Sequence, residues 1–152
     1  MSGLQNQSHV VLMADDDSDD RLLAADAVKE SGTSMKMQFV VDGAQMMNYL
    51  RRKNEFINPS DSPRPDLIIL DLNMPVMDGR EALREIKNDP KLKTIPVVVL
   101  TTSNSDTDVA FVYQTGANSF ITKPTAFNAL VDVMKSLNSY WFSQVILPGK
   151  VS

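Results

Sequence analysis

The sequence alternates short apolar runs with stretches of helical periodicity, and this alternation constrains the fold more than any other feature. Runs rich in branched apolar residues are typical of strands buried on both faces of a parallel sheet. Five such strands are predicted, at residues 10–14, 37–41, 67–70, 97–100 and 120–122. Helices are predicted between and after them, at residues 18–31, 80–88, 106–116 and 127–141, with a further helix that starts at residue 43 and carries Met46, Met47 and Leu50.

Strands and helices in strict alternation predict right-handed crossovers and a doubly wound α/β sheet. The chain has 152 residues, which suits one packed domain. We expect a flexible N-terminus over residues 1–8, a folded domain over 9–139 and a C-terminal extension over 140–152.

Local signals refine the predicted elements. Ser18 is the expected cap of the first helix, with Leu22, Ala25 and Val28 on its buried face. Residues 58–65 contain three prolines and no periodicity, which predicts a surface loop. The last helix has an apolar stripe at spacings of 3, 4, 3 and 4, formed by Phe127, Leu130, Met134, Leu137 and Trp141.

Composition excludes several classes of function. The chain has no cysteine, so it has no disulfide, thiolate metal site or cysteine nucleophile. Its formal charge of −4 and lack of a long basic run argue against nucleic-acid binding. No apolar stretch is long enough to span a membrane, and residues 1–8 do not resemble a secretory signal, so we expect no membrane association and a cytoplasmic location.

Polar side chains follow four of the predicted strands. Asp15 and Asp16 follow the first strand, Asp71 the third, Thr101 the fourth and Lys123 the fifth. In doubly wound sheets, ligands bind beyond the carboxyl ends of the strands. We therefore expect these five side chains to meet at one edge of the sheet.

The charges in this set predict a divalent cation. Three carboxylates and one ammonium sum to −2, which a divalent ion would neutralise, whereas without it the carboxylates would raise one another's pKa. Oxygen ligands with no His or Cys favour a hard ion, and Mg²⁺ is the usual choice where phosphate takes part. Asp71 is then placed to attack phosphorus and form an aspartyl phosphate.

Four motifs occur in order at these strand ends: ADDD, LDLNMPVMDG, VVVLTTS and FITKP. Together they resemble the receiver domain of two-component response regulators over about residues 10–138. The resemblance implies a flavodoxin-like (βα)5 receiver fold, a five-stranded parallel sheet. It also implies a protein that accepts a phosphoryl group from a histidine kinase, catalyses only its own phosphorylation and dephosphorylation, and is otherwise not an enzyme.

The resemblance assigns a role to each matching residue. Asp71 is similar to the phosphoacceptor. Asp16 resembles the direct metal ligand, Asp15 a ligand acting mostly through water, and the Asn73 backbone carbonyl a further ligand. Thr101 and Lys123 resemble the switch hydroxyl and the phosphate-contacting lysine. Phe120 lies where the family has its switch aromatic, often Tyr, and Pro124 follows a bond that is often cis in the family.

Two further features resemble the small single-domain regulators that partner cyanobacterial phytochromes, which are light-sensing histidine kinases. These features are the proline-rich insertion at 58–65 and the segment SYWFSQVILPG. The resemblance implies a homodimer through the fourth helix, fifth strand and fifth helix, which Tyr140, Trp141 and Phe142 could extend.

The acidic patch is also compatible in principle with three other functions. A calcium-binding loop would require Gly and Glu where the chain has Asp20 and Asp26, so it is rejected. A metal-dependent phosphatase would make Asp15 the nucleophile and would need a substrate pocket. A binding module that never takes up phosphate is the third reading. Asp17, Asp19 and Asp20 are expected to be solvated charges at a helix start.

Overall fold

The computed structural model describes residues 8–149. The predicted flexible N-terminus, except Ser8, lies outside the described residues, and so do residues 150–152 of the predicted C-terminal extension. The boundaries of the three predicted segments remain predictions.

Five parallel strands form one sheet in the order β2-β1-β3-β4-β5. The strands are β1 (Val10–Ala14), β2 (Lys36–Val40), β3 (Leu67–Leu70), β4 (Val97–Thr101) and β5 (Ser119–Thr122). This is the flavodoxin-like order, and the order reverses between β1 and β3. The predicted fold class is confirmed, and the predicted strands are right to within one residue at each end.

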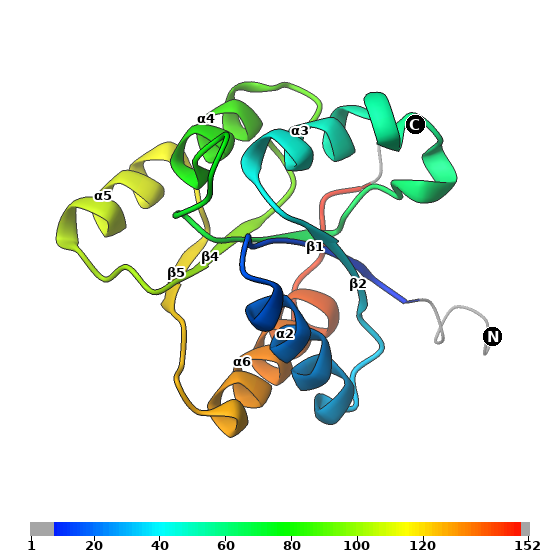
Figure 1. Cartoon of the computed structure of the whole chain (residues 1–152). Helices are drawn as coiled ribbons and strands as arrows, with labels where there is room; N and C mark the ends of the chain where they lie inside the picture. The colour runs from blue at the N-terminus through cyan, green and yellow to red at the C-terminus, as the bar shows by residue number, and fades with distance from the viewer. Residues whose placement is uncertain (1–7, 150–152) are drawn as a thin grey trace.

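Helices cover both faces of the sheet, as Figure 1 shows. They are α2 (Ser18–Ser31), α3 (Gly43–Arg51), α4 (Gly79–Asn88), α5 (Asp106–Thr115) and α6 (Phe127–Ser139). Helices α2 and α6 pack together on one face, and α3, α4 and α5 lie side by side on the other. The fourth and fifth helices of the sequence prediction are therefore α5 and α6.

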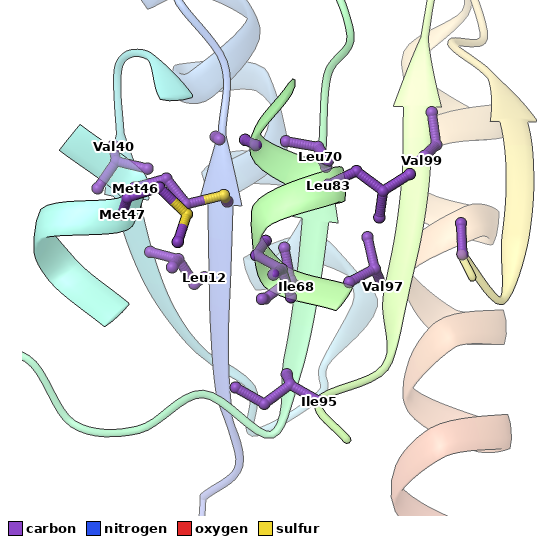
Figure 2. Packing of buried hydrophobic residues seen from close by; sticks show 14 of the residues in the cluster. Leu12, Val40, Met46, Met47, Ile68, Leu70, Leu83, Ile95, Val97 and Val99 are labelled. Atoms are coloured by element: carbon purple, nitrogen blue, oxygen red, sulfur yellow. The ribbon is translucent and has the colours of Figure 1, made fainter. Parts of the chain in front are cut away.

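Alternate side chains of the central strands pack into two separate hydrophobic cores, because successive side chains of a strand point to opposite faces of the sheet. Leu12, Ile68 and Val99 belong to the core under α3, α4 and α5. In Figure 2 these side chains lie with Met46 of α3 and Leu83 of α4. Residues one position away, such as Val11 and Ile69, pack instead under α2 and α6. Because both faces of these strands are buried, their sequences are continuous apolar runs.

The start and the buried face of α2 differ from the predictions. Asp17, not Ser18, caps the helix, and its carboxylate accepts the Asp19 and Asp20 N–H groups. Leu22 was expected to be buried but is 62% exposed, and the buried face consists of Ala24, Ala27 and Val28. Small alanines let α2 lie close to α6, so packing overrides the simple apolar count.

The proline-rich segment is a surface loop, as predicted, but it is anchored. It contains the 3₁₀ turn Pro59–Asp61, which follows a first turn at Asn54–Phe56. Ser62 is buried, and its hydroxyl donates to the Phe56 and Asn58 carbonyls. The buried Tyr49 hydroxyl of α3 donates to the Pro63 carbonyl at 2.7 Å.

The last helix ends before Trp141. Helix α6 stops at Ser139, and a π-helical turn occupies Tyr140–Gln144. Trp141 and Phe142 pack partly against the core under α2 and α6, and Phe142 stacks on His9 with ring centroids 4.2 Å apart. Of the three aromatic residues proposed to extend a dimer face, Tyr140 is the most exposed, at 52%.

Two further observations concern the whole described chain. The Lys123–Pro124 bond is trans, as are all peptide bonds between residues 8 and 149, so the cis bond implied by the resemblance is not observed. Within the same residues, no helix has the length and apolar character needed to cross a membrane.

Candidate functional site

The backbone ladder of the sheet extends one residue past three strand ends. The Asp15 N–H donates to the Val40 carbonyl at 3.1 Å, and the Asp71 N–H donates to the Ala14 carbonyl at 3.1 Å. The Lys123 N–H donates to the Thr101 carbonyl at 2.8 Å. The sheet itself therefore fixes the backbone of these polar residues at its carboxyl edge.

The turn after β3 approaches this edge closely. The Gly79 N–H donates to the Leu72 carbonyl at 2.9 Å, and a Cβ at Gly79 would collide with the Asp71 carbonyl oxygen. Asp78 caps α4 by accepting the Arg80 N–H at 2.7 Å. The Asp-Gly pair thus allows α4 to start directly against the Asp71 backbone.

Three carboxylates meet where the strand order reverses. Oxygens of Asp15, Asp16 and Asp71 all lie within 4.8 Å of one another. Asp15 and Asp71 are buried, whereas Asp16 is exposed. Asp15 Oδ1 accepts the Asp17 N–H at 3.0 Å, and Asp71 Oδ1 accepts the Asn73 N–H at 3.4 Å. Each buried carboxylate therefore keeps its second oxygen, Oδ2, for other partners.

The Lys123 ammonium lies against those second oxygens. Its Nζ is 2.7 Å from Asp15 Oδ2 and 3.3 Å from Asp71 Oδ2. It is also 2.8 Å from Asp20 Oδ2, on the first turn of α2. Asp15 Oδ2 makes no hydrogen bond of good geometry within residues 8–149, so the close approach of Lys123 is an ion pair.

Burial and neighbouring charges have opposite effects on the pKa values of Asp15 and Lys123. Burial raises the pKa of the Asp15 carboxyl, although the Lys123 ammonium and the Asp17 N–H act against this rise. Burial would lower the pKa of Lys123, but the ion pair with Asp15, the hydrogen bond to Asp20 and the charge of Asp71 outweigh burial and raise that pKa. The ammonium is thus held in its charged form by the carboxylates around it.

The donor set suits a hard divalent cation. It consists only of carboxylate oxygens from Asp15, Asp16 and Asp71, and buried Asp15 Oδ2 is not satisfied by a hydrogen bond. A cation beside several close carboxylates relieves their repulsion, and oxygen ligands favour the hard ions. The residues present therefore fit the predicted metal site.

The other predicted site residues occupy neighbouring positions. Thr101 is fully buried at the end of β4, and its Oγ1 accepts the Ser103 N–H at 3.5 Å. Phe120 is half-buried on β5, against the core under α3, α4 and α5. Asn73 is exposed in the turn after Asp71. Their suggested roles as switch hydroxyl, switch aromatic and carbonyl ligand remain predictions.

Sequence reasoning missed Asp20, which it assigned to the solvated helix start. The structure instead places its carboxylate on Lys123, 103 positions away in the chain. No local signal marks this contact, because the Asp17 cap and the fold together determine it.

A second missed feature ties α4 to α5 beside the site. The Arg80 guanidinium donates to both carboxylate oxygens of Asp108, at 2.8 and 2.7 Å. Ser103, two residues after Thr101, donates to the same carboxylate at 2.6 Å. Hydrogen bonds from Arg80 and then Ser103 hold the pKa of Asp108 well below its ordinary value. The loop after β4 is thereby fastened to α4.

Comparison with known proteins agrees with this geometry. Residues 11–135 match the response regulator receiver domain. Response regulator Rcp1 of Synechocystis sp. is 40% identical over 149 residues, which cover 98% of this chain and 99% of Rcp1.

Solved structures show the same likeness. The phosphorylated cyanobacterial phytochrome response regulator RcpA is 39% identical, with a TM-score of 0.86 over 94% of this chain and 100% of that chain. The Mn²⁺-bound form of Rcp1 is 39% identical, with a TM-score of 0.82 over 93% of this chain and 99% of that one. The resemblance deduced from the motifs is confirmed, and the chain belongs to the response regulator receiver domain family.

Proposed function

We propose that this protein is a phosphorelay response regulator that accepts a phosphoryl group on Asp71 from a histidine kinase, in a Mg²⁺-dependent reaction. One observation carries the proposal. Asp71 lies within 4.8 Å of two further carboxylates, and its Oδ2 lies 3.3 Å from the Lys123 ammonium. A nucleophilic carboxylate beside a metal-type cluster and a fixed cation suits phosphoryl transfer.

In the proposed reaction, an Asp71 carboxylate oxygen attacks the phosphorus of a phosphohistidine. The new O–P bond forms as the N–P bond breaks, and the histidine nitrogen keeps the electron pair. Lys123 then offsets negative charge on the phosphoryl oxygens. Hydrolysis of the aspartyl phosphate later returns Asp71, so the protein acts only on its own phosphoryl group.

Asp15, Asp16, Asp71 and the Asn73 backbone carbonyl would hold the metal ion. When bound, Mg²⁺ supplies positive charge at the phosphoryl oxygens. The all-carboxylate cluster supports a hard divalent ion, and the similar regulator Rcp1 has been solved with Mn²⁺.

The output would be a change of surface. Thr101 would move toward the phosphoryl group and Phe120 would follow inward, which shifts an existing equilibrium between two conformations. Both residues lie on the strands next to α5, so the face formed by α5, β5 and α6 is the proposed homodimer surface. Exposed Tyr140 lies beyond the end of α6 and would extend it.

A phytochrome is the proposed kinase. Support comes from RcpA, a cyanobacterial phytochrome response regulator that shares 39% of its residues with this chain over nearly its full length. Transfer from an autophosphorylated cyanobacterial phytochrome that is at least tenfold faster than from a kinase of another sensory class would support this pairing. Equal transfer rates from the two kinases would contradict the proposal that a phytochrome is the partner.

The phosphatase reading is less favoured by the structure. The cavity of about 50 Å³ beside Lys123 is not lined by Asp15, Asp16 or Asp71, so it gives a substrate no access to the Asp15 carboxylate. Asp15 Oδ2 also lies against Lys123 and is fully buried, so attack by Asp15 on a substrate would be hindered.

Intact mass after incubation with acetyl phosphate and Mg²⁺ tests the central proposal. We expect one added phosphoryl group, lost on addition of EDTA and absent in Asp71→Asn. Exposed Asp26→Asn is the control and should label like the wild type. Peptide mapping that places the group on Asp15 would establish the phosphatase-type reading instead. If neither acetyl phosphate nor a phosphorylated kinase labels the protein, the remaining function is that of a binding module that never takes up phosphate.

Self-association is tested by sedimentation at matched concentrations with and without the phosphodonor. We expect phosphorylation to strengthen the dimer. Unchanged mass in both samples would exclude a phosphorylation-dependent dimer, and an unaltered dissociation constant in Tyr140→Ala would remove this residue from the interface.

A further inference from the structure

Asp20 adds a fourth carboxylate to the site, and it reaches Lys123 from a different element. The Asp20 N–H lies 3.3 Å from the capping Asp17 Oδ1, which fixes the first turn of α2. From there the carboxylate accepts a 2.8 Å hydrogen bond from the Lys123 Nζ. Helix α2 is thus linked directly to the loop that follows β5.

Three carboxylate oxygens surround the ammonium of Lys123. A lysine ammonium carries three N–H bonds. Three carboxylates lie within 3.3 Å of Nζ, namely those of Asp15, Asp20 and Asp71. A phosphoryl oxygen on Asp71 would therefore compete with these carboxylate oxygens for the Lys123 ammonium.

Asp20 is the carboxylate that can be released most easily. The Asp15 side chain has no exposed surface and that of Asp71 only 8%, so losing the ammonium would leave a charged oxygen without water. The Asp20 side chain is 35% exposed and can be hydrated when it leaves Lys123. When Lys123 binds a phosphoryl oxygen, the contact that it gives up is therefore the one with Asp20.

We infer that Asp20 is a positioning residue that competes with the phosphoryl group for the Lys123 ammonium and so limits how readily the phosphorylated form is reached. This inference rests on the proposed function, because it requires a phosphoryl group on Asp71. It assigns Asp20 no contact with the reacting atoms. Its influence passes through Lys123 alone.

Beryllofluoride, which mimics a phosphoryl group on a carboxylate, is the probe. Its apparent dissociation constant is measured by calorimetry at fixed Mg²⁺ for the full chain. We expect Asp20→Asn to bind beryllofluoride about three- to tenfold more tightly than the wild type, since a charged hydrogen bond no longer opposes binding. Asp20→Glu, which keeps the charge, should restore affinity to near the wild-type value.

Asp19→Asn is the matched control. It removes the same charge one residue away on the same helical turn, where the side chain is exposed and does not contact Lys123. We expect it to change the dissociation constant by less than about twofold, because exposed charges interact weakly across water. An equal gain in Asp19→Asn and Asp20→Asn would show a general charge effect and overturn the inference.

The Lys123→Ala background tests the route of the effect. If Asp20 acts through the ammonium, adding Asp20→Asn to Lys123→Ala should leave the dissociation constant unchanged. The same gain in both backgrounds, or unchanged or weaker binding in Asp20→Asn alone, would overturn the inference. Phosphorylation of the wild type by acetyl phosphate is checked in parallel, because it tests the proposed function separately from the role of Asp20. If the wild type is phosphorylated but the Asp20 variants do not behave as expected, only the role of Asp20 is refuted.

Discussion

The Tyr113 hydroxyl accepts a hydrogen bond from the backbone N–H of Phe120 at 3.1 Å. Tyr113 lies on α5, and Phe120 lies on β5, which within residues 8–149 pairs with β4 alone and is an edge strand. Edge strands expose unpaired N–H groups that invite pairing with other chains. The side chain of Tyr113 therefore covers a backbone group on the proposed dimer face.

Removing this hydroxyl should expose the Phe120 amide. In Tyr113→Phe we expect faster hydrogen exchange at Phe120 and a loss of about 0.5–1.5 kcal/mol in the free energy of unfolding. Tyr140→Phe is the control, because the Tyr140 hydroxyl makes no hydrogen bond within the described residues. Exchange at Phe120 that is the same in all three proteins would contradict the role given to Tyr113.

Gly79 should not tolerate a side chain. A Cβ there would collide with the Asp71 carbonyl and the Leu72 Cα. We expect Gly79→Ala to lower the free energy of unfolding by about 1–3 kcal/mol and to weaken Mg²⁺ binding, as the turn after β3 shifts. Urea unfolding and calorimetric Mg²⁺ titration measure the two effects.

Gly149→Ala is the matched change for Gly79→Ala, since a Cβ at Gly149 meets no atom of residues 8–149 within 4 Å. It should leave both quantities unchanged. Normal stability and normal Mg²⁺ affinity in Gly79→Ala would mean that the close approach of α4 to Asp71 is not required.

The Arg80–Asp108 ion pair should make stability depend on pH. The pKa of Asp108 is held below its ordinary value, so its contribution is complete above about pH 4 and is lost as pH falls through the lower folded-state pKa. We expect Asp108→Asn to lower the free energy of unfolding by about 1–2 kcal/mol at pH 7 and by less at pH 3.

Urea unfolding at the two pH values checks this expectation, with Asp106→Asn as the control. Asp106 is an exposed acid in the same helical turn and makes no ion pair within residues 8–149. A difference between wild type and Asp108→Asn that stays constant from pH 7 to pH 3 would exclude the proposed linkage.

The buried Tyr49 hydroxyl should anchor the proline-rich loop. It donates to the Pro63 carbonyl at 2.7 Å, and burial raises the pKa of Tyr49 to about 12. The hydroxyl thus remains a donor throughout the neutral and moderately alkaline range. We expect Tyr49→Phe to lose about 1–2 kcal/mol of stability, because the Pro63 carbonyl loses its partner, and to be cleaved faster by proteases in the loop.

Limited proteolysis followed by mass mapping measures that cleavage. Ser60→Ala removes an exposed hydroxyl in the same loop whose one hydrogen bond within the described part of the chain goes to Asn58. This variant should be cleaved at the wild-type rate. Equal cleavage of Tyr49→Phe and wild type would show that the loop is held by other contacts.

The sequence allowed the sheet and most of the site to be predicted because both depend on short-range order. Each apolar run is a strand, and the residue after a strand must lie at the sheet edge, so Asp15, Asp71 and Lys123 could be placed together. Their assigned roles remain to be tested.

The failures have a different origin. On the buried face of α2, Val28 was predicted correctly, but Ala24 and Ala27 are buried in place of Leu22 and Ala25. These alanines give close helix contact that an apolar count ignores. Contacts such as Asp20 with Lys123 join residues far apart in the chain, and pairing of charges is not encoded by spacing. The π-helical turn at Tyr140–Gln144 likewise depends on packing against the core.

The backbone hydrogen bonds that continue past the strand ends fix the positions of the site residues independently of the chemistry of their side chains. The N–H groups of Asp15, Asp71 and Lys123 are held by carbonyls of neighbouring strands, and any residue except proline could make the same bonds. The positions are therefore inherited from the sheet, whatever side chain they carry. A lineage with this scaffold could exchange its acids and its lysine for other groups and obtain a new reaction without having to rebuild the protein.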